Sequence, residues 1–115
     1  MVKVESLKKS SHFKIVLKEK KFHTDFFSIF AAKNFIKLNN KNALSVSFVM
    51  KKKIGSAVKR NRIKRKLKAI VAKLLKIKGA INYNYTYIVF GKTKAYNEKY
   101  DILLSEMAKT FKKIN

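Results

Sequence analysis

Apolar side chains in the middle of the chain recur with the period of an α-helix. At about 100° per residue, five of them fall on one arc, which predicts a helix face turned towards a core. We expect this helix to begin at Ala57, because Gly55 can take a backbone conformation closed to most residues and Ser56 is a good N-cap. Gly79 then closes it as a left-handed C-cap. The apolar arc consists of Ile63, Leu67, Ile70, Val71 and Leu74.

Alternation with a period of two predicts strands on both sides of this helix. Residues 22–32 and 43–50 alternate in this way, and residues 83–90 form a strongly β-prone run that ends at Gly91. Residues 33–42, rich in Asn and Lys, predict a loop, although Phe35, Ile36 and Leu38 could extend a strand into it. In the second strand Ser45 and Ser47 share a face, which either leaves room for a ligand or faces solvent.

Two further helices are expected at the ends of the chain. Residues 7–21 predict an N-terminal helix, with Ser10 or Ser11 as its cap and Phe13 among its apolar positions. Asn97 is the expected cap of the last helix, which has acidic residues in its first turn and lysines in its last, as the helix dipole prefers. Its predicted buried stripe is Tyr100, Leu103, Leu104, Met107, Phe111 and Ile114.

These elements predict an α+β fold in one domain, residues 1–115, with the order α-β-β-β-α-β-α and a mixed sheet of about four strands. The strand before the central helix and the strand after it are expected to be parallel, because a helix of this length forms a crossover connection. Base rates favour a right-handed crossover. The chain has no cysteine, so neither disulfides nor cysteine-based chemistry are possible.

Charge narrows the choice of partners. The formal net charge is +23, and no Asp or Glu occurs between residues 26 and 97. Such a chain repels itself and is stabilised by a polyanion. A membrane surface is the competing polyanion, but a folded core of mixed elements favours RNA or DNA. With no signal peptide and no membrane span in the sequence, we expect a cytoplasmic protein.

The positive charge is most concentrated on the central helix. All three arginines, Arg60, Arg62 and Arg65, fall within six residues, and arginine offers a planar fork for phosphate that lysine lacks. A solvated helix face is the alternative explanation, but such faces normally carry acidic residues at i,i+4 to lysine, and this helix has none. On the helical wheel Arg60, Asn61, Lys64, Arg65 and Lys68 project together, while Lys59, Arg62 and Lys66 lie farther round.

Residues 52–65, KKIGSAVKRNRIKR, resemble the signature of the bacterial ribonuclease P protein subunit, in which a Lys-Lys-hydrophobic-Gly segment leads into an Arg-Asn-Arg helix. A weaker resemblance extends from about Leu7 to the C-terminus. The resemblance implies a ribosomal-protein-like fold with a rare left-handed βαβ crossover. It also implies that the basic helix binds a catalytic RNA. The RNA-binding candidates are Lys51, Lys52, Lys53, Arg60, Asn61, Arg62, Lys64, Arg65 and Lys68.

The resemblance further implies a groove for the single-stranded 5′ leader of precursor tRNA. In the family two aromatic residues four positions apart flank this groove, and a glycine usually follows the helix. Phe13 matches the first aromatic residue, but Leu17 stands at the second position and Lys20 at the glycine. Core packing is the alternative role for Phe13. The candidate groove residues are Phe13, Leu17, Phe30 and Ser47.

No catalytic constellation is visible in the sequence. His12 and His23 are isolated, and Glu98 and Asp101 are explained by the helix dipole. We therefore expect no metal, cofactor or small-molecule substrate on the protein itself. The resemblance implies that the RNA subunit cleaves precursor tRNA with the Mg²⁺ it requires, and that the protein assists.

Two other functions remain open from the sequence. A ribosomal or other RNA-scaffolding protein would share the charge and the mixed fold. A DNA-binding module could place the central helix in a major groove, but among the lysines and arginines at the start of that helix only Asn61 could read bases.

Overall fold

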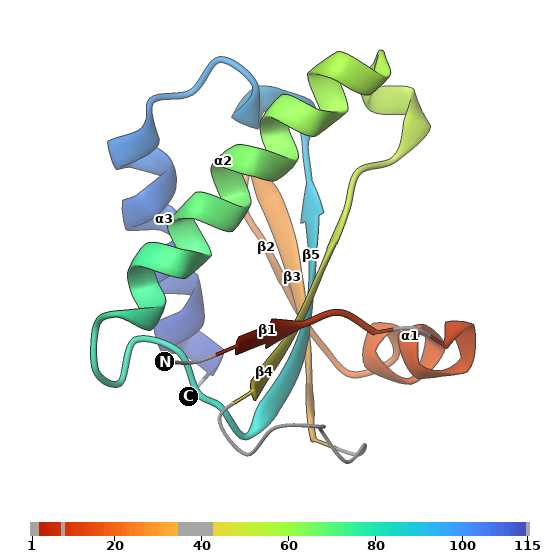
Figure 1. The fold of residues 1–115 in the computed structure, drawn as a ribbon, viewed down its shortest axis with the longest axis vertical. Coiled ribbons are helices and arrows are strands. Elements are labelled where there is room, and N and C mark those ends of the chain that lie inside the picture. Colours follow the sequence, from red (N-terminus) through yellow and green to blue (C-terminus); the bar gives the residue numbers. More distant parts are fainter. Residues whose placement is uncertain (1–2, 8, 35–42, 115) are drawn as a thin grey trace.

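A five-stranded mixed sheet separates one helix from two others (Figure 1). The computed structural model describes residues 3–7, 9–34 and 43–114. The strands are β1 (Lys3–Glu5), β2 (Lys20–His23), β3 (Phe27–Lys33), β4 (Ala43–Val49) and β5 (Tyr85–Gly91), in the spatial order β1-β4-β5-β3-β2. β4 runs parallel to both β1 and β5, whereas β3 is antiparallel to β5 and β2.

Helix α1 (Ser10–Leu17) lies on one side of the sheet, and α2 (Ala57–Leu75) and α3 (Tyr100–Ile114) lie on the other (Figure 1). Two short 3-10 helices, η1 (Lys52–Ile54) and η2 (Thr93–Ala95), precede α2 and α3. The predicted α-β-β-β-α-β-α order is confirmed from α1 to α3, and β1 stands in front of it as an unpredicted edge strand.

The connection from β4 through α2 to β5 is a crossover between parallel strands, as predicted. In Figure 1 the chain rises along β4, descends along α2 and rises again along β5, which lies behind β4. That path is left-handed, as the resemblance implies and against the base rate.

Each face of the sheet buries its own hydrophobic cluster. On the side of α2 and α3, Tyr87 of β5 packs edge-on against Phe111 of α3, with ring centroids 5.0 Å apart. On the side of α1, Val16 packs with Leu7 and Ile88. The strands therefore send successive side chains to opposite faces, as the period of two predicts.

Helix α2 forms as its sequence predicts. Gly55 has φ +145°, and the Ser56 hydroxyl accepts a hydrogen bond from the backbone N–H of Lys59 at 3.3 Å. The helix ends at Leu75, a few residues before the predicted closure, and Gly79, with φ +79°, lies in the turn that follows. All five residues of the predicted arc are buried: Ile63, Leu67, Ile70, Val71 and Leu74.

Two predicted elements had wrong bounds. Helix α1 stops at Leu17 rather than extending over residues 7–21, and Lys20 and Lys21 belong to β2. The predicted strand over residues 22–32 is a hairpin, because the Thr24 hydroxyl accepts hydrogen bonds from the N–H groups of Phe26 and Phe27 and turns the chain. The possible strand extension over residues 35–38 lies outside the described residues.

Helix α3 begins at Tyr100, so Asn97 is not its cap. The Glu98 carboxylate accepts a hydrogen bond from the N–H of Lys99 at 2.9 Å just before the helix. Most of the predicted stripe is buried, but Leu104 is half-buried and Tyr100 is exposed. The buried members of the stripe are Leu103, Met107, Phe111 and Ile114.

Truncation of the buried face of α2 tests this architecture. Leu67→Ala and Ile70→Ala should each lower the free energy of unfolding by about 2–5 kcal/mol, because each removes fully buried methyl groups. Arg65→Ala, on the exposed face of the same helix, is the matched control and should leave this free energy unchanged or slightly raised. Urea denaturation followed by circular dichroism measures the difference. Equal losses in all three variants would mean that the arginine face is structural.

Candidate nucleic-acid interface

The outer surface of α2 is cationic. Asn61, Arg62, Arg65 and Lys68 are exposed, while Arg60 and Lys64 are half-buried. No Lys or Arg of α2 forms an ion pair with any carboxylate in the part of the chain that the structure describes. The mutual repulsion of these charges is therefore uncompensated within that part of the protein.

One flank of α2 adjoins β4 and has an apolar floor. Arg60, Asn61 and Lys64 line a hollow of about 240 Å³ whose floor includes Phe48 and Met50. The Nε of Arg60 is buried and has no hydrogen-bond partner among the described residues. This flank combines cations with an aromatic surface, since the Lys68 ammonium also lies 5.9 Å from the Phe48 ring centroid.

The opposite flank of α2 contacts the segment before α3 through hydrogen bonds and cation–π contacts. The Arg62 guanidinium lies 5.5 Å from the Tyr96 ring centroid and donates to its hydroxyl at 3.3 Å, and the Lys59 ammonium lies 5.0 Å from the same ring. Lys66 donates to the carbonyl oxygens of Ala95, Tyr96 and Glu98 at 3.3, 2.6 and 3.1 Å. Arg62 and Lys66 thus join α2 to the segment before α3, a contact that no local pattern in the sequence predicts.

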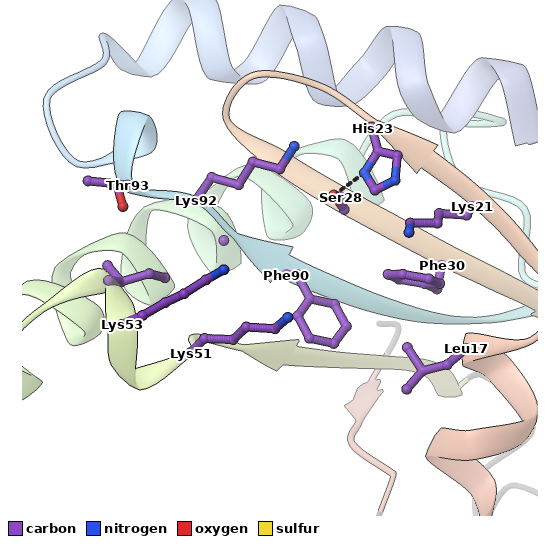
Figure 2. A pocket seen from close by; sticks show the side chains of 12 residues that line it. Leu17, Lys21, His23, Ser28, Phe30, Lys51, Lys53, Phe90, Lys92 and Thr93 are labelled. Atoms are coloured by element: carbon purple, nitrogen blue, oxygen red, sulfur yellow. Dashed lines mark hydrogen bonds between the residues drawn. The ribbon is translucent and has the colours of Figure 1, made fainter.

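A second surface lies on the other side of the sheet. It is an open groove of about 790 Å³ that runs past the end of α1, across β2, β3 and β5, to η1 (Figure 2). Apolar side chains and lysines make up most of its lining. The lining residues are Leu17, Lys21, His23, Ser28, Phe30, Lys51, Lys53, Ile54, Phe90, Gly91, Lys92 and Thr93.

Two phenylalanines form the aromatic part of this groove. Phe30 and Phe90 contact each other edge to face, with ring centroids 5.4 Å apart. The Lys21 ammonium lies 5.3 Å from the Phe30 centroid and the Lys51 ammonium 5.5 Å from the Phe90 centroid. Each ring is therefore paired with a cation, an arrangement suited to a base and its phosphate.

His23 and Ser28 form the polar part of the groove. Their side chains are joined by a hydrogen bond of 2.5 Å between Nδ1 and Oγ (Figure 2). Ser28 is buried, with 4% of its surface exposed. Desolvation lowers the pKa of the His23 imidazole, and the charges of Lys21 and Lys92 lower it further.

The structure brings together only part of the predicted leader groove. Leu17 and Phe30 line it, but Phe13 is half-buried in the cluster beneath α1. Ser47 is 3% exposed and accepts a hydrogen bond from the N–H of Leu7 at 2.8 Å, so it faces neither a ligand nor solvent. Its neighbour Ser45 is also buried.

The remaining lining residues were not predicted for this groove. Lys51 and Lys53, which the sequence grouped with the basic helix, line the groove, whereas Lys52 is exposed outside its lining. Phe90 was missed. Its alternation with Thr86 and Ile88 puts these three residues on one face of β5, and Ile88 pairs with Phe30, so Phe90 shares that face with Phe30. That alternation was the available signal.

Residues 3–7, 9–34 and 43–114 contain no group of three or more His, Asp or Glu side chains placed to hold a metal ion. Within those ranges no helix is both long and apolar enough to span a membrane.

Comparison with known proteins identifies a family model that matches this chain. Residues 1–115 match the family model described as Ribonuclease P. The ribonuclease P protein component of Paramagnetospirillum magneticum is 29% identical over 73 residues, which amount to 64% of this chain and 53% of that protein. That match therefore spans about half the length of the curated relative.

Solved structures share the fold. The RNase P protein of Thermotoga maritima superposes with a TM-score of 0.75 at 22% identity, covering 96% of this chain and 98% of that one. The RNase P protein of Staphylococcus aureus superposes with a TM-score of 0.62 at 24% identity, covering 95% and 93%. With the family match over its whole length, this chain belongs to the ribonuclease P protein family.

Proposed function

We propose that this chain is the protein subunit of a ribonuclease P ribonucleoprotein. It binds the catalytic RNA and the 5′ leader of precursor tRNA, and so assists the endonucleolytic removal of that leader in the cytoplasm. The observation that carries the proposal is that two cationic surfaces of different chemistry lie on opposite sides of one sheet. Two surfaces of different chemistry suit two RNA ligands, one structured and one unpaired.

The α2 surface suits the backbone of a folded RNA. Its exposed arginines and lysines form no ion pairs among the described residues, so phosphates would relieve their repulsion. Arg65 and Lys68 are exposed, and Arg60 lies beside them with an Nε that lacks a hydrogen-bond partner in the described part of the chain. We assign contact with the catalytic RNA to this surface.

The groove suits an unpaired strand. Unpaired bases can stack on aromatic rings, and Phe30 and Phe90 are only partly buried. Lys21, Lys51 and Lys53 are exposed beside them to receive phosphates. We assign the 5′ leader to this groove. The bond cleavage belongs to the RNA partner with its Mg²⁺, and the chain supplies binding and orientation.

Variants of the two surfaces should separate assembly with the catalytic RNA from binding of the 5′ leader. Arg65→Ala should weaken assembly with the catalytic RNA and leave the ratio of precursor to mature tRNA affinity unchanged. Lys21→Ala and Lys51→Ala should leave assembly intact and lower that ratio severalfold, because they remove cations that lie beside the groove rings. The measurement is the affinity of the assembled particle for precursor and mature tRNA.

Lys112→Ala is the matched control, since Lys112 is an exposed lysine on α3 outside the lining of either surface. It should change neither quantity beyond the small effect of one unit of net charge. The leader assignment fails if the two groove variants lower precursor and mature tRNA affinity equally.

Salt should weaken binding of the catalytic RNA steeply. If roughly five phosphates are contacted, the logarithm of the affinity should fall with the logarithm of salt concentration with a slope of about −4, given 0.7–0.9 per phosphate. Arg65→Ala should make that slope shallower by the contribution of about one phosphate contact, roughly 0.7–0.9. A filter-binding titration at several salt concentrations measures it, and a nearly salt-independent affinity would contradict the charge-based account.

A further inference from the structure

The polar groups of the groove are mostly hydrogen-bond donors. Lysine ammonium groups donate and never accept, and Lys21, Lys51 and Lys53 are exposed along the groove. The Lys92 ammonium donates to the carbonyl oxygen of Thr24 at 2.6 Å, and like the other lysines it cannot accept a hydrogen bond. The donor or acceptor character of the groove beside Phe30 therefore depends on His23 and Ser28.

The Ser28 hydroxyl fixes the tautomer of His23. This hydroxyl is buried, and Nδ1 of His23 is its hydrogen-bond partner. No other partner of the hydroxyl exists among the described residues. A buried O–H without an acceptor costs free energy, so the hydroxyl donates to Nδ1. The neutral imidazole then carries its hydrogen on Nε2, where it is free to donate to a ligand.

The charge state of His23 does not change this role. Desolvation, Lys21 and Lys92 lower its pKa, which favours the neutral ring at neutral pH. Protonation at lower pH would add a hydrogen at Nδ1 and leave the N–H at Nε2 in place. Nε2 is a donor in both states.

The strand register puts this donor beside the aromatic pair. Across β2 and β3, Lys21 pairs with Phe30 and His23 pairs with Ser28. The two residue pairs are two positions apart on one face of the sheet, about 7 Å along the strand. Figure 2 shows His23, Lys21 and Phe30 along the same side of the groove. A base that packs against Phe30 therefore has its edge within reach of His23.

Nucleobases differ in what they present to such a donor. Guanine and uracil carry carbonyl acceptors where adenine and cytosine carry amino donors. An amino group that faces lysines and the Nε2–H would be left without an acceptor, whereas a carbonyl would be satisfied. Among the hydroxyls of the lining, Ser28 is buried and Thr93 is exposed, so the Thr93 oxygen is the acceptor that competes with this pattern.

We infer that the groove prefers keto bases, uracil and guanine, over amino bases at the nucleotide that packs against Phe30, with His23 as the specificity-determining residue and Ser28 as its positioning residue. The inference rests on the proposed function for the identity of the strand as a precursor leader. The preference itself is a property of the isolated chain.

Matched oligonucleotides test the inference directly. Uridine and cytidine pentamers carry the same phosphates and differ at the 4-carbonyl and 4-amino groups and in the hydrogen on N3. Inosine and adenosine pentamers differ in the same way at position 6 and N1. Fluorescence anisotropy with the full chain should show the keto member of each pair binding more tightly, by about threefold to tenfold for one hydrogen bond. The phosphate contribution cancels in each ratio.

Variants connect the preference to its residues. His23→Phe keeps an aromatic ring without a donor and should bring both ratios close to one. Ser28→Ala removes the hydroxyl that donates to Nδ1, so the His23 hydrogen can move to Nδ1 and Nε2 can accept. Both keto-to-amino affinity ratios should then fall, while the mean affinity for the two oligonucleotides of each pair stays unchanged. Thr93→Val, which removes the competing acceptor, should keep or raise the ratios, and Lys112→Ala should leave them unchanged.

Ratios near one in the unaltered protein would overturn the inference, as would a preference that survives in both His23→Phe and Ser28→Ala. Either result would leave the proposed function standing, provided that Lys21→Ala and Lys51→Ala still lower the precursor affinity of the assembled particle. Failure of that particle assay alone would instead refute the leader assignment and leave the base preference as a property of the groove.

Discussion

Burial of one arc of α2 against the sheet is the interaction on which the rest of the structure depends. Full burial of an aliphatic side chain stabilises a fold by roughly 1.5–3 kcal/mol, and five such side chains of α2 are buried. Like-charge pairs at i,i+4 cost only a few tenths of a kcal/mol each. The packing therefore outweighs the repulsion, and a helix without acidic residues can hold its arginines and lysines towards solvent.

The same sheet positions the second surface. Because the residues of β3 and β5 alternate between faces, the strands that bury Tyr87 against α3 also present Phe30 and Phe90 on the side of α1. The hairpin turn at Thr24 then brings His23 and Lys21 beside Phe30. Under the proposed function, structured RNA and an unpaired strand would therefore bind at once without competing for the same side chains.

The sequence predicted the elements that have strong periodicity. It did not predict the positions of residues that are set by tertiary contacts. The buried arc of α2 and the strand that ends at Gly91 followed from period and capping, because both signals are local. The burial of Ser47 could not be predicted, because it comes from the N-terminal segment through a contact across 40 residues. The position of Lys51 and Lys53 in the groove, rather than on α2, comes from the turn at η1, and β1 was missed because three residues carry too little pattern.

Reconstituted cleavage tests whether the protein assists a catalytic RNA. A bacterial ribonuclease P RNA is incubated with precursor tRNA at a magnesium concentration too low for the RNA to work alone, with and without this chain. We expect accurate 5′ leader removal only when both RNA and protein are present, and none with the protein alone. Absence of restored cleavage under conditions where the RNA binds the chain, or site-specific cleavage by nuclease-treated protein without the RNA, would contradict this expectation.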